Sequence, residues 1–395
     1  MRDASTCGVA APIEGAAEMS ATLFSPIEIR GVRLKNRVVV SPMWQYSGVD
    51  GRPTQTHTVH YGRLAEGGAG LVLQEGTTVT RSGRGTLGDL GIWDDSMVPL
   101  YSRLVDVVKA GGAVPGIQLI HAGRKGRRNP PWSAHTPRPA ASDDWRVLGP
   151  SAVPIGVEEF STPVEMSLGD IEDTVTAFAN AARRADEAGY EVLDLQAAHG
   201  YLIHSFLSPL TNRRTDRYGG STENRFRFLV EIIDRIRATW PAGKALFVRL
   251  SCVDVEWTID QSVELVRELG THGVDVIDCS SGGITGLPFP GAKADYGYQV
   301  PYAEEIRSRT GSRTMAVGHI VHATQAQAIV ENGQADLVAL GRELLHNPHW
   351  PLDAARKLGL PDPYAQAPTR ISYWLRKREK SFPGFTPSTE GSGLW

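Results

Sequence analysis

Eight short runs of apolar and β-branched residues recur along the chain, and segments of helical length separate them. The runs occupy residues 37–43, 70–77, 114–120, 190–198, 245–251, 274–281, 314–320 and 336–342. Continuous apolar strands of this kind are typical of parallel sheets, whose two faces are both buried. Their alternation with helices predicts βαβ units. Eight such units over roughly 340 residues predict an α/β fold, the (β/α)8 TIM barrel with insertions.

Two of the intervening segments show helical periodicity. In residues 170–189 the apolar positions at helical spacing are Ile171, Val175, Phe178 and Ala182. We expect Asp170 or Gly169 to cap the start of this helix and Gly189 to end it. Residues 222–240 form the second helical segment.

An open, doubly wound sheet is the competing fold. It usually has fewer strands and places a glycine-rich phosphate loop after its first strand. Here the first strand leads into SPMWQYS at residues 41–47, which is not glycine-rich. The pattern therefore favours the closed barrel.

Three regions follow from this pattern. Residues 1–21 are expected to form a flexible tail, and residues 22–360 the barrel. Residues 361–395 form a C-terminal extension of mixed aromatic and basic character, which either wraps its own barrel or contacts a neighbouring subunit. The polar, proline-rich stretch 121–169 follows the third strand and is too long for a simple connection, so we expect it to cover the active site.

The composition argues against several functional classes. The net charge of −3 gives no support for a nucleic-acid surface or a membrane anchor. No apolar stretch approaches the roughly 18 residues of a membrane helix. The first twenty residues include acidic side chains and no sustained apolar run, so we expect no secretory signal and a cytoplasmic location. The three cysteines form no CxxC motif, which argues against a disulfide framework or a zinc site.

Two local motifs resemble ligand-binding signatures without the context that such signatures need. Residues 83–88 match G-x-G-x-x-G, but the residues that follow do not open a helix, as dinucleotide binding requires. His57 and His60 have a spacing that suits a metal but lack a third partner, and we expect them on a helix surface.

Side chains that follow the strands are the candidates for chemistry, because active sites of this barrel lie at the carboxyl ends of its strands. After the first strand they are Ser41, Pro42, Met43, Trp44 and Tyr46. After strands two to five they include Gly76, Gln118, Gln196, His199, Tyr201 and Arg249. We find no lysine and no pair of carboxylates at the strand ends, which argues against a Schiff-base aldolase and a glycosidase. Hydrogen-bonding residues dominate instead, and they predict a bound heterocyclic cofactor that supplies its own reactivity.

The loops after strands seven and eight form a predicted phosphate site. They contain Gly318 and the pair Gly341–Arg342. Backbone N–H groups, a helix start and a guanidinium can converge on a dianion at this position of the barrel. Tight turns with a surface ion pair are the alternative interpretation.

Longer motifs resemble those of a known family. They are SPMxxY at residues 41–46, GIQLIHAGRK at 116–125, AAHGYLIHSFLSPLTNRRTDRYGGSTENRFRF at 197–228, FVRLS at 247–251 and LGRELLHNP at 340–348. Over residues 22–360 the chain resembles the Old Yellow Enzyme family of NADH:flavin oxidoreductases. Within that family it is most similar to the thermophilic-like and xenobiotic-reductase subclass of bacterial ene-reductases.

The resemblance implies FMN that is reduced by NAD(P)H and that passes a hydride from N5 to an activated alkene. The residues implied to hold the flavin ring are Ser41, Pro42, Met43, Trp44, Gly76, Gln118 and Arg249. Those implied to hold its phosphate are Gly318, Gly341 and Arg342. A fixed positive charge at Arg249 would stabilise the anionic reduced ring.

The resemblance also assigns the substrate side. Gln196 and His199 take the positions that bind the substrate's carbonyl oxygen, and Tyr46 contacts the substrate. Tyr201 takes the position that protonates the α-carbon. The implied partners are a small-molecule substrate and further copies of the chain, in a homodimer or homotetramer.

Two positions depart from the family pattern. Gln196 replaces a usual histidine, and Trp44 replaces the cysteine common in this subclass. A carboxamide donates hydrogen bonds but cannot become cationic, so it polarises a carbonyl less. Ordinary enone reduction is one hypothesis. A flavin-dependent desaturase, oxidase or oxygenase acting on a specialised, even aromatic, substrate is the alternative, and a flavin-binding barrel without catalysis is a third.

Overall fold

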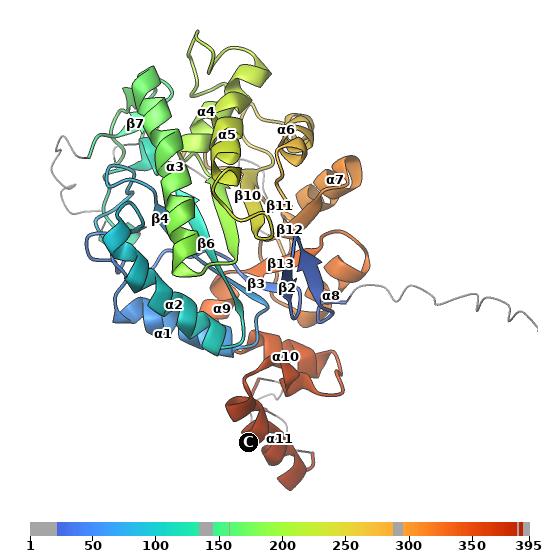
Figure 1. The fold of residues 1–395 in the computed structure, drawn as a ribbon. Coiled ribbons are helices and arrows are strands. Elements are labelled where there is room, and N and C mark those ends of the chain that lie inside the picture. Colours follow the sequence, from blue (N-terminus) through green and yellow to red (C-terminus); the bar gives the residue numbers. More distant parts are fainter. Residues whose placement is uncertain (1–21, 134–144, 158, 287–294, 385–386, 390–395) are drawn as a thin grey trace, which may run out of the picture.

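The computed structural model describes residues 22–133, 145–157, 159–286, 295–384 and 387–389. Figure 1 shows this part of the chain as a central sheet surrounded by helices. The predicted tail at 1–21, part of the predicted insertion and the last residues of the C-terminal extension lie outside the described residues.

Eight parallel strands form a closed barrel, which confirms the predicted (β/α)8 fold. They are β3 (Val38–Val40), β4 (Leu71–Thr78), β6 (Val114–Ile120), β9 (Val192–Ala197), β10 (Ala245–Ser251), β11 (Val276–Ser280), β12 (Arg313–Ala316) and β13 (Leu337–Leu340). The sheet closes because β3 pairs with β13 on one side and with β4 on the other. Each strand overlaps one of the eight predicted runs.

Helices cover the outside of the barrel and follow the strands in turn. They are α1 (Gln55–Glu66), α2 (Val98–Ala110), α3 (Leu168–Ala188), α5 (Thr222–Arg237), α6 (Ile259–Thr271), α7 (Val300–Thr310) and α8 (Ala323–Glu331). The short helices α4 (Leu202–Leu207) and α9 (Arg342–His346) begin directly after strand-end loops, and α10 (Trp350–Lys357) follows α9. Apolar side chains between strands and helices form the main core.

A hairpin seals the amino-terminal end of the barrel. It consists of β1 (Ile27–Ile29) and β2 (Val32–Leu34), which pair antiparallel. Ile29, Val32 and Leu34 are buried in one cluster with residues near the starts of the barrel strands, such as Leu71 and Val192. This end is filled with apolar side chains, so the opposite end is left for polar chemistry.

The start of α3 differs from the prediction. Ser167, not Asp170 or Gly169, caps the helix: its hydroxyl accepts the Asp170 N–H at 3.1 Å, and the Asp170 carboxylate accepts the Ser167 N–H at 2.8 Å. This reciprocal pair satisfies two N–H groups at the helix start. Gly189 ends the helix at φ +94°, as predicted.

The expectation that His57 and His60 lie on a helix surface is wrong. Both belong to α1, but their exposed fractions are 0% and 4%, because this face of the helix packs on the barrel. Burial lowers the pKa of His60 to about 4. The described residues include no group of three side chains that could hold a metal.

The C-terminal extension and the described part of the insertion lie outside the barrel proper. Helix α11 (Thr369–Ser381) follows the 3-10 turn η4 (Pro363–Gln366) and lies at the far end of α10 from the barrel (Figure 1). Its Tyr373 and Trp374 are exposed. The insertion contributes the short parallel pair β7 (Leu148–Gly149) and β8 (Val164–Glu165). None of the described helices is long and apolar enough to span a membrane.

Candidate active site

A pocket of about 630 Å³ lies at the carboxyl ends of the strands. Seven of the predicted site residues line it: Ser41, Met43, His199, Arg249, Gly318, Gly341 and Arg342. The other seven do not line it: Pro42, Trp44, Tyr46, Gly76, Gln118, Gln196 and Tyr201. Most of these seven are connected to the pocket by the contacts described below.

Arg249 places a buried positive charge in the pocket. It belongs to β10 and is 8% exposed. Its Nη1 lies 3.3 Å from Ser41 Oγ, and its Nε lies 3.3 Å from a carboxylate oxygen of Asp278 without forming a hydrogen bond. A buried N–H without a hydrogen-bond partner is costly, so this guanidinium retains capacity for a ligand that accepts hydrogen bonds.

Two glycines and an arginine form another part of the pocket wall. Gly318 has φ +115°, and a Cβ there would lie 2.9 Å from Gln299 Nε2. Gly341 precedes α9, and the exposed Arg342 lies with its Nη2 3.2 Å from His319 Nε2. Small backbone positions and a flexible cation suit a phosphate group. Together with Arg249, these residues fit FMN, which combines a polar ring with a phosphate.

A chain of amide groups lies beside the pocket. Gln118 donates from Nε2 to the Asp194 carboxylate at 2.7 Å, which fixes its carbonyl oxygen toward Gln196 Nε2 at 3.4 Å. Gln196 accepts the Ala198 N–H at 3.1 Å. Its Nε2 also lies 3.5 Å from His199 Nδ1. The two predicted carbonyl-binding side chains are therefore adjacent.

His199 connects this amide chain to the pocket. Its Nε2 lies 2.7 Å from Ser280 Oγ, and Ser280 donates its hydroxyl hydrogen to Gln299 at 3.2 Å. His199 Nε2 must then donate to Ser280, which leaves Nδ1 unprotonated. Burial, and then the charge of Arg249, hold the pKa of His199 well below its ordinary value. The imidazole is therefore a neutral hydrogen-bond donor.

Aromatic rings form a wall next to these groups. Trp44 donates from Nε1 to the Gly76 carbonyl at 2.9 Å, and its ring meets Tyr201 edge-on with centroids 5.4 Å apart. The ring centroid of Tyr46 lies 5.9 Å from that of Trp44 and 5.3 Å from that of Trp132, a residue of the insertion. This contact places one described residue of the insertion beside the site.

Tyr201 carries a hydroxyl proton that it holds strongly. The side chain is 7% exposed and stands just before α4. Burial raises the pKa of Tyr201 well above its ordinary value. The phenol is therefore protonated at every working pH and can give its proton only to a strong base such as a carbanion.

Glu75 fixes the loop that contains Trp44 and Tyr46. This side chain is fully buried within β4, and its carboxyl oxygens accept the Gln45 N–H at 2.9 Å and the Tyr61 hydroxyl at 3.0 Å. Burial raises its pKa from 4.5 to about 8. The aromatic wall therefore depends on a buried acid that is largely protonated at neutral pH.

The fold and the pocket define a barrel oxidoreductase of the flavin-binding type. The model of the NADH:flavin oxidoreductase / NADH oxidase family matches residues 22–360, and the chain belongs to that family. It is an oxidoreductase with FMN as cofactor and NAD(P)H as electron donor. The predicted membership in the Old Yellow Enzyme group is confirmed.

Several known proteins are similar to the chain. An NADPH dehydrogenase of Geobacillus sp. (strain WCH70) is 47% identical over 347 residues, which are 86% of this chain and 96% of that protein. Morphinone reductase in complex with tetrahydroNAD is 27% identical with a TM-score of 0.71, over 87% of this chain and 94% of that one. A 2-naphthoyl-CoA reductase in complex with 2-naphthoyl-CoA is 26% identical with a TM-score of 0.76, over 85% of this chain, which spans 52% of that protein.

Sequence reasoning missed several residues of the site. The predicted site does not include Lys125, which the turn η2 (Gly123–Lys125) after β6 places at the His199 carbonyl. Asp194 and Asp278 are buried inside the barrel, in β9 and β11, before the last residues of these strands. Gln299 lies in the long loop after β11. Side chains along a strand point alternately inward and outward, and this alternation could have identified the two aspartates. No local sequence pattern marks Lys125 or Gln299.

The Glu75→Gln variant tests the buried acid. Between about pH 4.5 and 8 the native state holds the Glu75 proton and the unfolded state does not, so the wild-type free energy of unfolding falls with rising pH. The slope for one such group is about 1.4 kcal/mol per pH unit. Glutamine removes this contribution, so denaturation at pH 5, 6 and 7 should show the variant gaining stability relative to wild type. Glu28→Gln changes an exposed side chain and should show no such trend. If the free energy of unfolding of Glu75→Gln changed with pH in the same way as that of wild type, the assignment would be contradicted.

Proposed function

We propose that the enzyme reduces activated C=C bonds of enone-type substrates, with NAD(P)H as electron source. FMN, when bound, supplies the hydride. The observation that supports this proposal is the contact between Gln196 and His199 beside a pocket that contains His199 and Arg249, with the buried Tyr201 two residues further along the same turn. Two neutral donors and a phenol suit an oxygen-binding pair with a proton donor next to it.

Gln196 and His199 would bind the carbonyl oxygen of the substrate. Gln196 Nε2 lies 3.5 Å from the unprotonated His199 Nδ1, so the carboxamide and the imidazole are neighbours beside the pocket. The carbonyl oxygen would take the His199 N–H from Ser280 and one amide hydrogen of Gln196. Hydrogen bonds to this oxygen stabilise the negative charge that develops on it as the β-carbon accepts hydride.

Tyr201 would protonate the α-carbon. Its raised pKa keeps the proton on the phenol until an enolate forms next to it. Trp44 and Lys125 contact its ring and restrict its orientation. The residue therefore acts after hydride transfer and has no role in the reduction of the cofactor.

Replacing Tyr201 separates the two half-reactions. Tyr201→Phe is expected to slow reoxidation by cyclohexenone by roughly 10²- to 10⁴-fold, the usual loss for a general acid. Reduction by NADPH should stay nearly unchanged, because it needs no proton from this residue. Stopped-flow spectroscopy measures both steps, and an equal loss in both would refute the donor role.

Replacing Gln196 tests the departure from the family pattern. Gln196→His is expected to raise turnover of cyclohexenone, because imidazole can take up a proton and polarise a carbonyl more strongly. Burial and the charge of Arg249, which lower the pKa of His199, act at this position too, because Gln196 is buried and pairs with Arg249 across the strands, so the gain should stay under about tenfold. Steady-state kinetics under anaerobic conditions give the comparison. A flat or lower rate would show that glutamine is adapted to another substrate.

A desaturase, oxidase or oxygenase acting on a specialised substrate is the second candidate. It is favoured by the aromatic wall of Trp44, Tyr46 and Trp132, which suits a flat ring. The similar 2-naphthoyl-CoA reductase is a protein with an aromatic ligand, which supports a bulky conjugated substrate.

The reaction with oxygen decides between the two candidates. The ene-reductase is expected to consume NADPH and enone in equal amounts without oxygen and to release little peroxide in air. Anaerobic turnover and peroxide assays on the FMN-loaded enzyme measure both quantities. Substrate oxidation that proceeds without added NAD(P)H, or rapid peroxide release, would favour the second candidate.

The remaining assignments complete the proposal. The residues that would hold FMN are Ser41, Pro42, Met43, Trp44, Gly76, Gln118, Arg249, Gly318, Gly341 and Arg342. Tyr46 would contact a small-molecule substrate. We also propose a cytoplasmic homodimer or homotetramer in which residues 361–395 contact a neighbouring subunit. The exposed aromatic side chains of α11 support that contact.

A further inference from the structure

His199 has an unusual backbone conformation for a residue with a side chain. Its φ is +59°, in the left-handed region, and Gly200 follows with φ +74°. A left-handed conformation at a non-glycine residue costs free energy, on the order of 1 kcal/mol or more. The surroundings must therefore hold this turn, which connects β9 to α4 and places His199 two residues before Tyr201.

Three side chains from different segments bind the peptide groups of the turn. Ser251, at the end of β10, accepts the His199 N–H at 2.9 Å, and His204, in α4, accepts the Gly200 N–H at its Nδ1 at 2.9 Å. Lys125, from η2, donates to the His199 carbonyl at 2.5 Å. Both polar backbone groups of His199 are thus bound by side chains.

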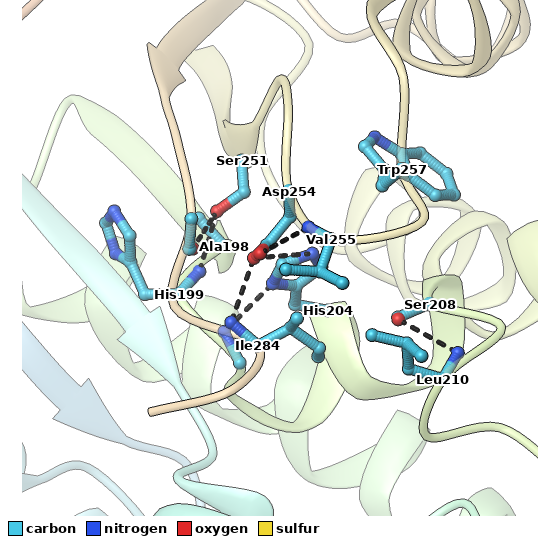
Figure 2. A network of polar contacts seen from close by, with 12 residues as sticks. Ala198, His199, His204, Ser208, Leu210, Ser251, Asp254, Val255, Trp257 and Ile284 are labelled. Atoms are coloured by element: carbon cyan, nitrogen blue, oxygen red, sulfur yellow. Dashed lines mark hydrogen bonds and ion pairs between the residues drawn. The ribbon is translucent and has the colours of Figure 1, made fainter. Parts of the chain in front are cut away.

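The turn also packs on the loop after β11 (Figure 2). A Cβ at Gly283 would lie 2.6 Å from His199 Cα, and a Cβ at Gly200 would lie 2.4 Å from the Gly283 carbonyl. Asp254 fixes this second loop, because its carboxylate accepts the Ile284 N–H at 2.8 Å. The same oxygen lies 4.0 Å from His204 Nε2. Gly283 also packs against the His199 carbonyl, because a Cβ there would lie 2.9 Å from the carbonyl oxygen, whereas Lys125 donates a hydrogen bond to that oxygen.

Lys125 is placed as a contact for the site and not as a structural ion-pair partner. It is 8% exposed, and none of the described carboxylates forms an ion pair with it. The nearby Asp254 carboxylate is used by the Val255 and Ile284 N–H groups. Lys125 Nζ lies 5.3 Å from the centroid of the Tyr201 ring. One ammonium therefore contacts both the carbonyl of His199 and the ring of Tyr201.

We propose that Lys125 is a positioning residue that sets the placement of the His199 donor relative to the Tyr201 hydroxyl. This inference rests on the proposed reduction of enones. A buried, unpaired ammonium lowers stability, and burial with the nearby Arg128 and Arg124 charges lowers the pKa of Lys125 to about 7. The contacts of Lys125 with the His199 carbonyl and the Tyr201 ring would give this loss of stability a functional reason. Lys125 touches neither the reacting atoms nor the cofactor pocket, so it acts through His199 and Tyr201.

Lys125→Met tests the proposal, because methionine keeps most of the apolar stem and removes the ammonium. Reoxidation of the reduced holoenzyme by cyclohexenone should slow by roughly 10- to 100-fold, the size expected for a misplaced donor. Reduction by NADPH should change less than threefold. Hydrogen–deuterium exchange of the resting protein should show faster exchange in residues 197–202 and no change in α5.

Two further variants make the test specific. Lys125→Arg keeps a cation of similar length and should restore at least part of the reoxidation rate. Lys109→Met removes a half-exposed lysine that pairs with Glu191 at 3.5 Å, and it should behave as wild type. If Lys125→Met does not fold, Lys125→Gln takes its place.

The outcomes separate the two hypotheses. Wild-type reoxidation rates and unchanged exchange in Lys125→Met would overturn the positioning role, as would equal losses in both half-reactions. If the wild-type enzyme reduces no enone while Lys125→Met still speeds exchange in residues 197–202, the proposed function fails and the contact to the turn stands.

Discussion

Closure of the sheet at β3 determines where every functional side chain points. Because β3 pairs with both β13 and β4, the strands have no free edge, and alternate side chains of each strand must face a common interior. The hairpin side of this interior is filled with apolar residues. Polar residues such as Gln118, Gln196 and Arg249 are placed at the other end, where they meet across neighbouring strands. A sheet open at β3 would separate the two ends of the pocket.

The polar end stores charge that the protein does not fully compensate. Arg249 lies close to Asp278 without a hydrogen bond from Nε, and burial raises the pKa of Asp194 to about 7. Incomplete pairing of buried charges is unfavourable for folding. A bound FMN ring would offer acceptors to the guanidinium and replace the missing partners. Cofactor binding and stability are therefore coupled at Arg249.

The sequence was sufficient for the architecture because a parallel strand buried on both faces is a continuous apolar run, and eight such runs stand out. Strand-end positions then predicted His199 and Arg249 in the pocket. Prediction failed where a contact depends on the path of a loop: Lys125 follows β6 by five residues and returns through a 3-10 turn. It also failed at His57 and His60, because a helix pattern does not show how completely a partly polar face is covered. The cap at Ser167 lies two residues before Gly169 and three before Asp170, because the reciprocal hydrogen bonds of Ser167 and Asp170 extend the helix start.

The backbone contact between Gly200 and Gly283 has a consequence for how this active site can diversify. Neither position accepts a Cβ without displacing the other loop, so the conformations of the loops after β9 and β11 depend on each other. A substrate loop transplanted from a relative into one of these places would misplace the other. Diversification, natural or engineered, would have to exchange the two loops together.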